Sequence, residues 1–421
     1  MRTARLDQVQ IGSKAPLQKA LRISSRAGFG ILLIFSWAEL FLSNSDELPA
    51  GQTPPGKIYH PPRTLPLTKF YDPPAPLPTG KPGELIRYEQ FDEYQLSYEV
   101  SAYRILYHSR SARGEDVAVS GVVLLPEGNP PAGGWPIIAW AHDFTGSARE
   151  CAPSLLKNLN QGPLLSMYAS LGYAVVASDY SGLGTDSPYT DLDSRSHAMD
   201  VIHSVVAARA ALPQLGRKWV AAGYGQGAVV AIAVDEAIKE SGDPDYEGTI
   251  AIAGVADLRD FFVHLAAQGT DYSPFVFLAH GIKTVFPEFR VDDILTANGL
   301  RLYQEIGRGC EAKAGNELAA HDLLKPRWES NSYVKAFFSR NALGTPPGSG
   351  PLLIIHGEAD ADVPTALAGK AVARLCEQKD RVLFVKYSGQ TGSAALSNSV
   401  SEQTSWLRAR FAGLPAPGNC P

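Results

Sequence analysis

The sequence predicts an α/β fold, in which a mostly parallel central sheet carries helices on both faces and a helical cap is inserted late in the sheet. Three observations support this prediction. Short apolar runs alternate with stretches of helical length, which is typical of a parallel sheet flanked by helices. Several runs are continuously apolar, as expected of strands covered on both faces. Roughly a hundred residues of helical and loop character precede the last two expected strands, too many for a structureless loop in a compact domain.

The expected elements follow one another in regular order along the chain. Apolar runs predict strands at 101–107, 117–125, 136–141, 174–178, 219–222, 249–253, 352–355 and 382–387. Longer stretches predict helices at 194–212, 228–241, 365–377 and 401–411. The cap should occupy about 257–345.

Two roles are open for the aromatic residues of the expected cap. They could line an acyl-binding pocket, or they could pack in the core of the cap, which is the more frequent role of aromatics at helical spacing. The residues in question are Phe261, Phe262, Phe275, Phe277, Phe286 and Phe289.

The N-terminal region predicts export. Residues 27–42 are apolar except for Glu39, and several Arg and Lys residues precede them, which is the layout of an export signal. The apolar stretch is shorter than the roughly 20 residues that cross a bilayer. We expect residues 1–45 to be an export signal or an uncleaved signal anchor. Any contact of the protein with a membrane should be made by this segment alone. The protein itself should be extracytoplasmic, either secreted or periplasmic.

A proline-rich stretch separates this region from the expected folded domain. Eleven prolines fall between Pro49 and Pro82, and a segment so rich in proline builds neither a helix nor a hydrogen-bonded ladder. We expect residues 46–84 to form an extended linker or an arm packed on the surface, and the domain to span residues 85–421.

The composition argues against nucleic-acid binding, and no cofactor motif is present. The formal net charge is −5, and no dense run of Lys and Arg is interleaved with aromatic residues. The sequence contains no phosphate-binding P-loop, no dinucleotide fingerprint and no HExxH. We therefore expect no cofactor, no metal and no nucleic-acid partner.

The four cysteines agree with export. Cys151, Cys310, Cys376 and Cys420 are spaced too widely, and have too few histidines nearby, for a zinc site. In an oxidising compartment they predict two disulfides, for which four cysteines allow three connectivities. Reduced, buried thiols are the alternative.

A glycine-rich turn is the feature that bears most directly on function. Residues 218–236 read KWVAAGYGQGAVVAIAVDE, an apolar run followed by a sharp turn and a stretch of small residues. A strand, turn and helix around G-x-S-x-G present a nucleophilic serine above the sheet of many hydrolases. The central position of this turn is Gly225, which has no side chain. The flanking glycines that allow close strand-to-helix approach are present, so the scaffold remains without the nucleophile.

Four motifs in consistent order give the chain a family resemblance. They read IIAWAHDFTGSARECAPSL (137–155), GYAVVASDYSGLG (172–184), KWVAAGYGQG (218–227) and PLLIIHGEADADVP (351–364). Together they resemble the secretory lipases of the α/β-hydrolase superfamily, lipase-A-like exported enzymes that cleave acylglycerols and other carboxylic esters. The resemblance extends from about Phe70 to the C-terminus. It implies an α/β-hydrolase fold with a late cap, and disulfides in sequence order, Cys151 with Cys310 and Cys376 with Cys420.

The same resemblance implies a degenerate catalytic triad. The family nucleophile falls on Gly225, and the triad acid falls on Asp360, in the HGEAD run after a strand. The triad histidine, expected in a Y-x-G-x-x-H pattern, falls on Gly392. In this fold the histidine follows the acid in sequence, and no histidine follows Asp360 because the last of the nine is His356. A shift of register therefore cannot restore the base.

The oxyanion loop departs from the family pattern as well. The family reads H-G-x-x-G where this chain reads His142, Asp143, Phe144, Thr145 and Gly146. Backbone N–H groups of this loop and of the residue after the nucleophile, here Gln226, stabilise a developing oxyanion in such enzymes. A carboxylate at position 143 that points into the site would oppose that charge.

The combined losses predict a pseudoenzyme with a lipid-related role. Removal of the nucleophile or the base alone costs on the order of a millionfold in turnover. We expect the chain to bind an acyl or ester ligand under the cap, or a partner, without catalysis. The alternative is an active carboxylic ester hydrolase, a lipase or esterase with a non-standard site; Thr391 and Ser393 lie beside the vacated histidine position, but no basic partner is near them in sequence.

Overall fold

The computed structural model describes residues 64–268, 274–306, 309–310 and 319–420. The chain divides into two units, residues 1–56 and 57–421, and every described residue belongs to the second. The expected export signal at 1–45 lies outside the described residues. Among the described helices, none is both long and apolar enough to cross a membrane.

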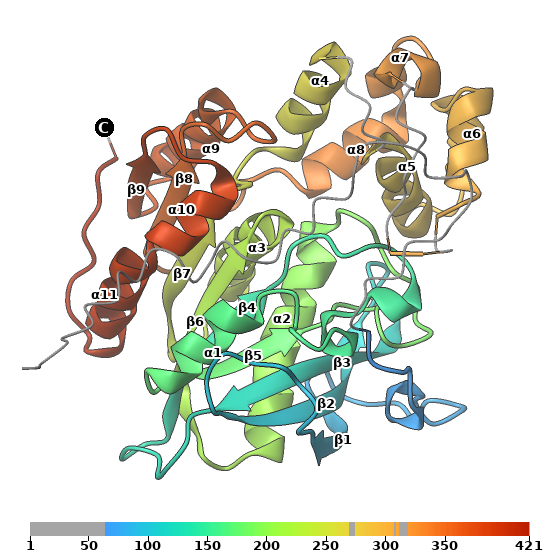
Figure 1. Ribbon diagram of the computed structural model, residues 1–421. Coiled ribbons are helices and arrows are strands. Elements are labelled where there is room, and N and C mark those ends of the chain that lie inside the picture. The colour runs from blue at the N-terminus through green and yellow to red at the C-terminus, as the bar shows by residue number, and fades with distance from the viewer. Residues whose placement is uncertain (1–63, 269–273, 307–308, 311–318, 421) are drawn as a thin grey trace, which may run out of the picture. The chain divides into compact units, whose positions relative to one another are not determined.

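A nine-stranded sheet forms the centre of the described unit, in the order β1-β2-β3-β5-β4-β6-β7-β8-β9 (Figure 1). The strands are β1 (Leu85–Gln90), β2 (Ser101–Arg110), β3 (Asp116–Leu125), β4 (Trp135–Ala141), β5 (Ala174–Ser178), β6 (Leu215–Tyr224), β7 (Tyr246–Ile252), β8 (Leu352–Gly357) and β9 (Val382–Tyr387). In this order, the neighbours β5-β4-β6-β7-β8-β9 are all parallel pairs. The neighbours β1-β2, β2-β3 and β3-β5 are antiparallel pairs.

The sheet confirms the expected fold class. Each of the eight expected strands exists, and two of them, β5 and β9, have the expected bounds. The strand β1 was not expected, because its residues are partly exposed and alternate without a continuous apolar run. It lies at one edge of the sheet and pairs only with β2.

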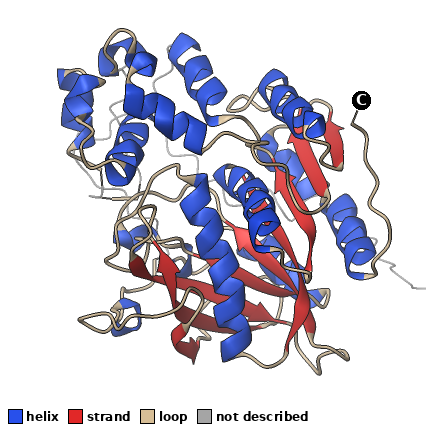
Figure 2. Ribbon diagram, turned by 180° about the vertical axis from the view of Figure 1, so that it is seen from behind, coloured by secondary structure: helices blue, strands red, loops and turns tan. Residues whose placement is uncertain are grey.

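Helices cover both faces of the sheet because successive side chains of each strand point to opposite faces. In β4, Ile137, Ala139 and Ala141 pack into one apolar core with helices α2 (Ser194–Ala211) and α3 (Gln226–Ser241). Ile138 and Trp140 pack into a second core with helices α1 (Gly162–Ser170), α10 (Gly392–Asn398) and α11 (Val400–Phe411). Figure 2 shows the face that carries the two long helices α2 and α3. Helix α9 (Thr365–Glu377) packs with α3 in a further core.

The described residues of the cap form five α-helices between β7 and β8 (Figure 1). They are α4 (Leu258–Gln268), α5 (Pro274–Val285), α6 (Ala297–Tyr303), α7 (Ala320–Leu323) and α8 (Ser332–Arg340). The cap has an apolar core of its own, which includes Phe262, Phe275, Phe289 and Phe337, all fully buried. A separate core explains how such a long insertion stays folded above the sheet.

Buried polar contacts and a disulfide attach the cap to the rest of the domain. Arg340 of α8 makes two hydrogen bonds to the fully buried Asp193, at 2.8 and 3.0 Å. Oδ1 of Asp191 accepts a hydrogen bond of 2.6 Å from Ser147, in the loop after β4. Oδ2 of the same residue lies 2.6 Å from Nδ1 of His280 in the cap helix α5. The disulfide Cys151–Cys310 joins the same loop region to the cap.

The ends of the described chain pack against the domain. Tyr71 of the 3-10 helix η1 (Lys69–Tyr71) is fully buried, and its hydroxyl lies 2.9 Å from Oγ of Ser154. At the other end, Asn419 exchanges side-chain hydrogen bonds with the backbone of Phe384 in the edge strand β9. The disulfide Cys376–Cys420 fixes this C-terminal segment. The structure therefore contains both disulfides that the family resemblance implies.

Candidate functional site: a glycine turn beneath the cap

Gly225 lies at the sharp turn between strand β6 and helix α3. Its backbone has φ 59° and ψ −123°, a conformation that side-chain-bearing residues rarely adopt. Its N–H donates to the carbonyl of Ile252 at the end of β7, at 3.1 Å. Glycine adopts this conformation without the strain that a side chain would bring. The turn thus keeps the geometry of a nucleophile elbow at the carboxyl end of a central strand.

The neighbouring glycines are required by close backbone approach. A Cβ at Gly223 would lie 2.0 Å from the carbonyl oxygen of Gly227, and a Cβ at Gly227 would lie 2.0 Å from that of Ala141 in β4. No side chain fits at either position. These two glycines explain why the turn is as tight as in a functional elbow.

The carboxylate of Asp143 binds the two backbone N–H groups that the family resemblance assigns to an oxyanion hole. Asp143 follows strand β4, and its Oδ1 accepts hydrogen bonds from the backbone N–H groups of Gln226 and Phe144, each at 2.8 Å. These are the donors that the family resemblance assigns to the oxyanion. Gln226 is also the first residue of α3, where the helix dipole favours a negative charge. The side chain of Asp143 therefore satisfies the donors that would otherwise face a reacting substrate.

The same carboxylate fills the space that a side chain at residue 225 would take. A Cβ built on Gly225 would lie 2.3 Å from Oδ1, 2.4 Å from Cγ and 2.6 Å from Oδ2 of Asp143. Burial raises the pKa of Asp143, the two backbone hydrogen bonds oppose that shift, and the charge of Asp362 adds to it. Position 143 and position 225 are thus structurally linked, because a side chain at residue 225 requires the carboxylate to leave.

Asp360 faces the vacated histidine position. It follows strand β8, and its Oδ1 accepts hydrogen bonds from the backbone N–H groups of Asp362 and Val363, both at 3.0 Å. Its other oxygen, Oδ2, lies 2.5 Å from where a Cβ of Gly392 would stand. The structure therefore brings Asp143 to Gly225 and Asp360 to Gly392, at the carboxyl ends of β4, β6 and β8 and the turn after β9.

Two buried histidines near the site do not replace the missing base. His142 has its Nε2 3.1 Å from the carbonyl of Asp179, and its ring stacks on Tyr180. Tyr180 stacks in turn on His197, whose Nδ1 lies 3.4 Å from Nε2 of Gln226. Burial lowers the pKa of His142 to about 4 and that of His197 to about 3. Neither residue is among those that line the cavity described next.

A cavity of about 410 Å³ opens over these positions, between the end of the sheet and the cap. Its floor includes Asp143, Gly225 and Asp360, and its volume lies in the range of small-molecule sites. The cap contributes an apolar wall that includes Leu258, Phe261, Phe262, Leu265 and Phe277. Of the six phenylalanines that were open to two roles, Phe261, Phe262 and Phe277 line the cavity; Phe275 and Phe289 are buried in the core of the cap, and Phe286 packs beside it.

Among the ionisable residues of this cavity, sequence reasoning missed two. Asp362 and Tyr224 both line it, and burial, followed by the charges of Asp143, Asp360 and Asp362, raises the pKa of Tyr224 to about 12. The run Glu358-Ala359-Asp360-Ala361-Asp362 reads as an ordinary solvated turn. Glu358 fits that reading, since it pairs with Lys386 at 3.4 Å and is not among the lining residues. The alternation of acidic residues in this run was the one signal for Asp362.

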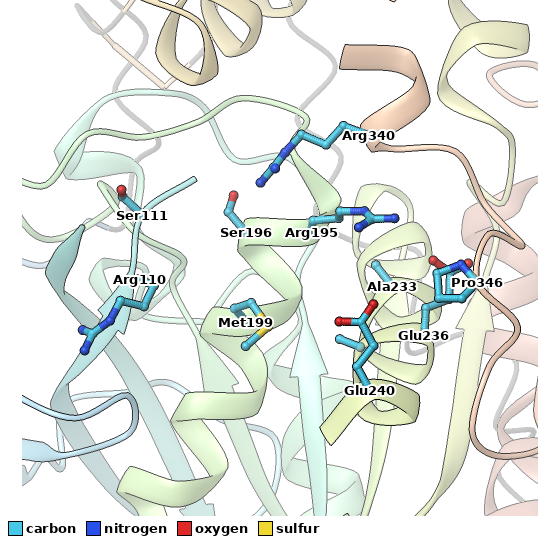
Figure 3. Close-up of a pocket in the computed structure, with 11 residues that line it drawn as sticks. Arg110, Ser111, Arg195, Ser196, Met199, Ala233, Glu236, Glu240, Arg340 and Pro346 are labelled. Carbon is cyan, nitrogen blue, oxygen red and sulfur yellow. The ribbon is translucent and has the colours of Figure 1, made fainter. Parts of the chain in front are cut away.

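A second, smaller hollow of about 200 Å³ lies between α2, α3 and the chain that follows α8 (Figure 3). Arg110, Arg195, Arg340, Glu236 and Glu240 supply its charged lining. Two of its arginines already have carboxylate partners elsewhere, Asp116 for Arg110 and Asp193 for Arg340. This hollow therefore has the character of a structural ion-pair region rather than of a reaction site. Within the described ranges, no group of three or more His, Cys, Asp or Glu residues is placed to hold a metal ion.

Solved structures with a similar fold are hydrolases. The rice cell wall degrading esterase LipA from Xanthomonas oryzae has a TM-score of 0.65 and 21% identity, over 79% of this chain and 98% of that chain. Candida antarctica lipase A in its closed state has a TM-score of 0.71 and 19% identity, over 84% of this chain and 88% of that chain. A putative hydrolase from Legionella pneumophila has a TM-score of 0.64 and 21% identity, over 78% of this chain and 98% of that chain. At these identities the likeness shows the fold alone.

The sequence itself carries a more specific signal. No curated protein sequence matches this chain significantly. The secretory lipase family profile, however, matches residues 159–419, which include the elbow, the cap, Asp360 and Gly392. This match and the two disulfides indicate an extracytoplasmic protein. The profile match over more than half of the chain, together with the nine-stranded α/β-hydrolase fold, shows that this chain belongs to the secretory lipase family.

Proposed function

We propose that this member of the secretory lipase family does not hydrolyse esters and instead binds an acyl or other apolar ligand in the cavity beneath its cap. One observation carries the proposal: the carboxylate of Asp143 takes both N–H donors of the oxyanion hole and the space of a side chain at residue 225. The site is therefore filled by the protein itself at the two places where an ester would react.

The loss of catalysis follows from the chemistry that remains. Without the nucleophile or the base, a serine hydrolase loses on the order of a millionfold in turnover. Such mutants still accelerate the reaction roughly 10³- to 10⁴-fold over the uncatalysed reaction in water, and this residual acceleration comes from the oxyanion hole and from substrate binding. Here Asp143 also blocks that hole, so even the residual stabilisation of a developing oxyanion is removed. Asp360 remains, but it has no imidazole to orient.

Ligand binding is supported by the cavity that the substitutions leave in place. Its apolar wall comes from the cap, and its volume is suited to a small acyl chain. A role in binding a partner through the cap has less support, because Val263 is the only exposed large hydrophobic residue in the described part of the cap.

Hydrolysis through a non-standard site is the rival function. Thr391 and Ser393 lie within 3.1 Å of each other through their hydroxyl oxygens, and both are exposed. Neither lines the cavity. An assay of the full chain on a short-chain nitrophenyl ester, beside Asp360→Ala, separates the two functions. We expect no difference between the two proteins, whereas turnover that disappears in Asp360→Ala would overturn the proposal.

Ligand binding has its own test. A neutral apolar probe, 1-decanol, should raise the melting temperature of the full chain, because a ligand that binds only the folded state stabilises it, by about 2.7 kcal/mol at a hundredfold excess over Kd. A second neutral probe is methyl decanoate, an ester with a ten-carbon acyl chain. If neither probe changes the melting temperature, the proposed ligand binding is contradicted.

A further inference from the structure

The cavity that the proposed function uses has a strongly asymmetric charge distribution. Its lining includes three carboxylates, those of Asp143, Asp360 and Asp362. No Lys, Arg or His is among the described residues that line it. The remaining lining is largely aliphatic or aromatic, and the cap contributes six of its residues, Leu258, Phe261, Phe262, Leu265, Pro274 and Phe277. A ligand in this cavity would therefore have an acidic region at one end and an apolar wall at the other.

Asp143 has an oxygen that no protein group binds. Its Oδ1 accepts the two backbone hydrogen bonds at the elbow, whereas its Oδ2 has no hydrogen-bond partner among the described residues. Because residue 225 is glycine, no Cβ stands beside Oδ2; one would lie 2.6 Å from it. Asp143 is sufficiently withdrawn from solvent that burial raises its pKa. Asp143 lines the cavity and is only partly exposed, so its Oδ2 is free to accept a hydrogen bond from a ligand there.

A fatty acid does not fit this arrangement. Its carboxylate would meet Asp143, Asp360 and Asp362, and like charges at short range repel. The backbone N–H groups of Gln226 and Phe144 could bind an anion, but both already donate to Asp143. The site that would hold an oxyanion in an active lipase is thus closed to anionic ligands.

A cationic head on an apolar chain fits both ends of the cavity. An ammonium group has three donors and no acceptor, so it can donate to Oδ2 of Asp143, and the carboxylates of Asp360 and Asp362 in the same lining attract its charge. The rings of Phe144 and Tyr224 also line the cavity, and aromatic faces attract cations. The alkyl chain would lie against Phe261, Phe277 and neighbouring residues of the cap. We infer that the cavity beneath the cap binds a cationic amphiphile, an alkyl chain with an amine head group, in preference to a fatty acid.

This inference rests on the proposed ligand-binding function and can fail separately from it. Three probes of equal chain length, decylammonium, 1-decanol and decanoate, are titrated calorimetrically into the full chain below their micelle concentrations at about pH 7, where the amine and the acid are both charged. We expect decylammonium to bind about tenfold tighter than 1-decanol, and decanoate to bind weakest. Equal or tighter binding of decanoate overturns the inference, and so does equal binding of decylammonium and 1-decanol. Failure of all three probes overturns the proposed function with it.

Two variants locate the head-group site. Asp143→Asn keeps a side-chain oxygen for the N–H groups of Gln226 and Phe144 but removes the charge, so it should abolish most of the preference for decylammonium and leave 1-decanol binding within about twofold. The matched control is Glu358→Gln, which neutralises a carboxylate outside the cavity and should leave the preference unchanged. A preference that survives Asp143→Asn, or that Glu358→Gln removes equally, contradicts this placement. Because the order of the three probes is measured on the wild type, the test does not depend on the stability of either variant.

Discussion

Asp143 and Gly225 compete for one volume: a Cβ on Gly225 would stand 2.3 Å from Oδ1 of Asp143. The contact lies at the N-terminus of α3, where Oδ1 also accepts the N–H of Gln226. The two substitutions relative to the family pattern therefore support each other. Glycine at residue 225 leaves space beside the turn, and the carboxylate of Asp143 fills that space and accepts the N–H groups of Gln226 and Phe144.

Gly225→Ala should destabilise the wild type by about 3 kcal/mol or more, because backbone strain costs about 1 to 3 kcal/mol and displacement of Asp143 leaves buried N–H groups unpaired at a similar cost. In an Asp143→Gly background the clash is absent, so the same change should cost about 1 to 2 kcal/mol less. Urea unfolding of the four proteins measures this coupling. Additive effects, within about 0.5 kcal/mol, would show that the two positions do not compete.

Reduction of the cavity should reduce ligand binding. Val229 of α3 lines the cavity, and Val229→Trp places a large ring in it. We expect the affinity for 1-decanol to fall about tenfold or more, since the ligand loses apolar surface to bury. Val263→Trp is the matched control, because Val263 is exposed on α4 and is not among the lining residues. Equal losses in both variants would mean that the probe binds elsewhere.

Two neighbouring carboxylates on α3 should make stability depend on pH. Asp235 accepts the N–H of Gly350 and Glu236 accepts the N–H of Gly344, both at 2.7 Å, so they hold the chain that joins the cap to β8. Burial raises the pKa of each to about 7. Raised folded-state pKa values mean that the neutral forms stabilise the fold fully below about pH 4, and that this contribution is lost as the pH rises to about 7.

The variant Asp235→Asn with Glu236→Gln tests this sign. Relative to wild type, its unfolding free energy should rise by on the order of 5 kcal/mol between about pH 5 and about pH 8, about half from each carboxyl group, because the wild type loses stability over that range and the amides do not. The difference between the two proteins is the quantity to measure, since Asp200, His142 and His203 also have shifted pKa values and titrate in both. A constant difference would show that these carboxyl groups are already ionised at the lower pH.

The two disulfides should differ in their contribution to stability. Cys151–Cys310 spans 159 residues and Cys376–Cys420 spans 44. The chain-entropy treatment gives the longer loop an advantage of about 1 kcal/mol, on losses of about 2 to 5 kcal/mol for either bond. Paired Cys→Ala variants, compared by urea unfolding, measure both losses. A larger loss for the shorter loop would show that coverage of the edge strand β9 by Asn419 outweighs loop entropy.

The sequence was sufficient for the sheet but not for its first strand. Continuous apolar runs such as those of β5 and β8 predict buried strands because both faces are covered. Strand β1 is an edge strand with one partner and partly exposed residues, so it lacks that signal. Helix α10 was also missed; its small residues, which begin at Gly392, resemble a loop, and they form a helix because Thr391 caps it and Ala395 packs into a core.

At the site, sequence could name positions but not their relationship. The motifs identify Gly225, Asp360 and Gly392 one by one. Whether Asp143 points into the site depends on the path of the loop after β4, which is fixed by contacts far apart in sequence, such as the Gln226 N–H that binds its carboxylate. The same holds for the cap, where helical spacing cannot separate Phe277, on the cavity wall, from Phe275, in the core.

The central claim is that Asp143, Gly225 and Gly392 together silence an intact hydrolase scaffold. It is tested most directly by hydrolysis of a short-chain nitrophenyl ester by the full chain and by the variant Asp143→Gly, Gly225→Ser, Gly392→His. A form with Ala253→Gly added is included because a Cβ at residue 392 would lie 2.9 Å from that of Ala253. The control keeps Asp143 and carries only Gly225→Ser and Gly392→His. We predict ester turnover in at least one of the two variants that carry Asp143→Gly, and little in the control that keeps Asp143. The wild type should show no more turnover than its Asp360→Ala variant. Wild-type turnover that is lost in Asp360→Ala would contradict the claim.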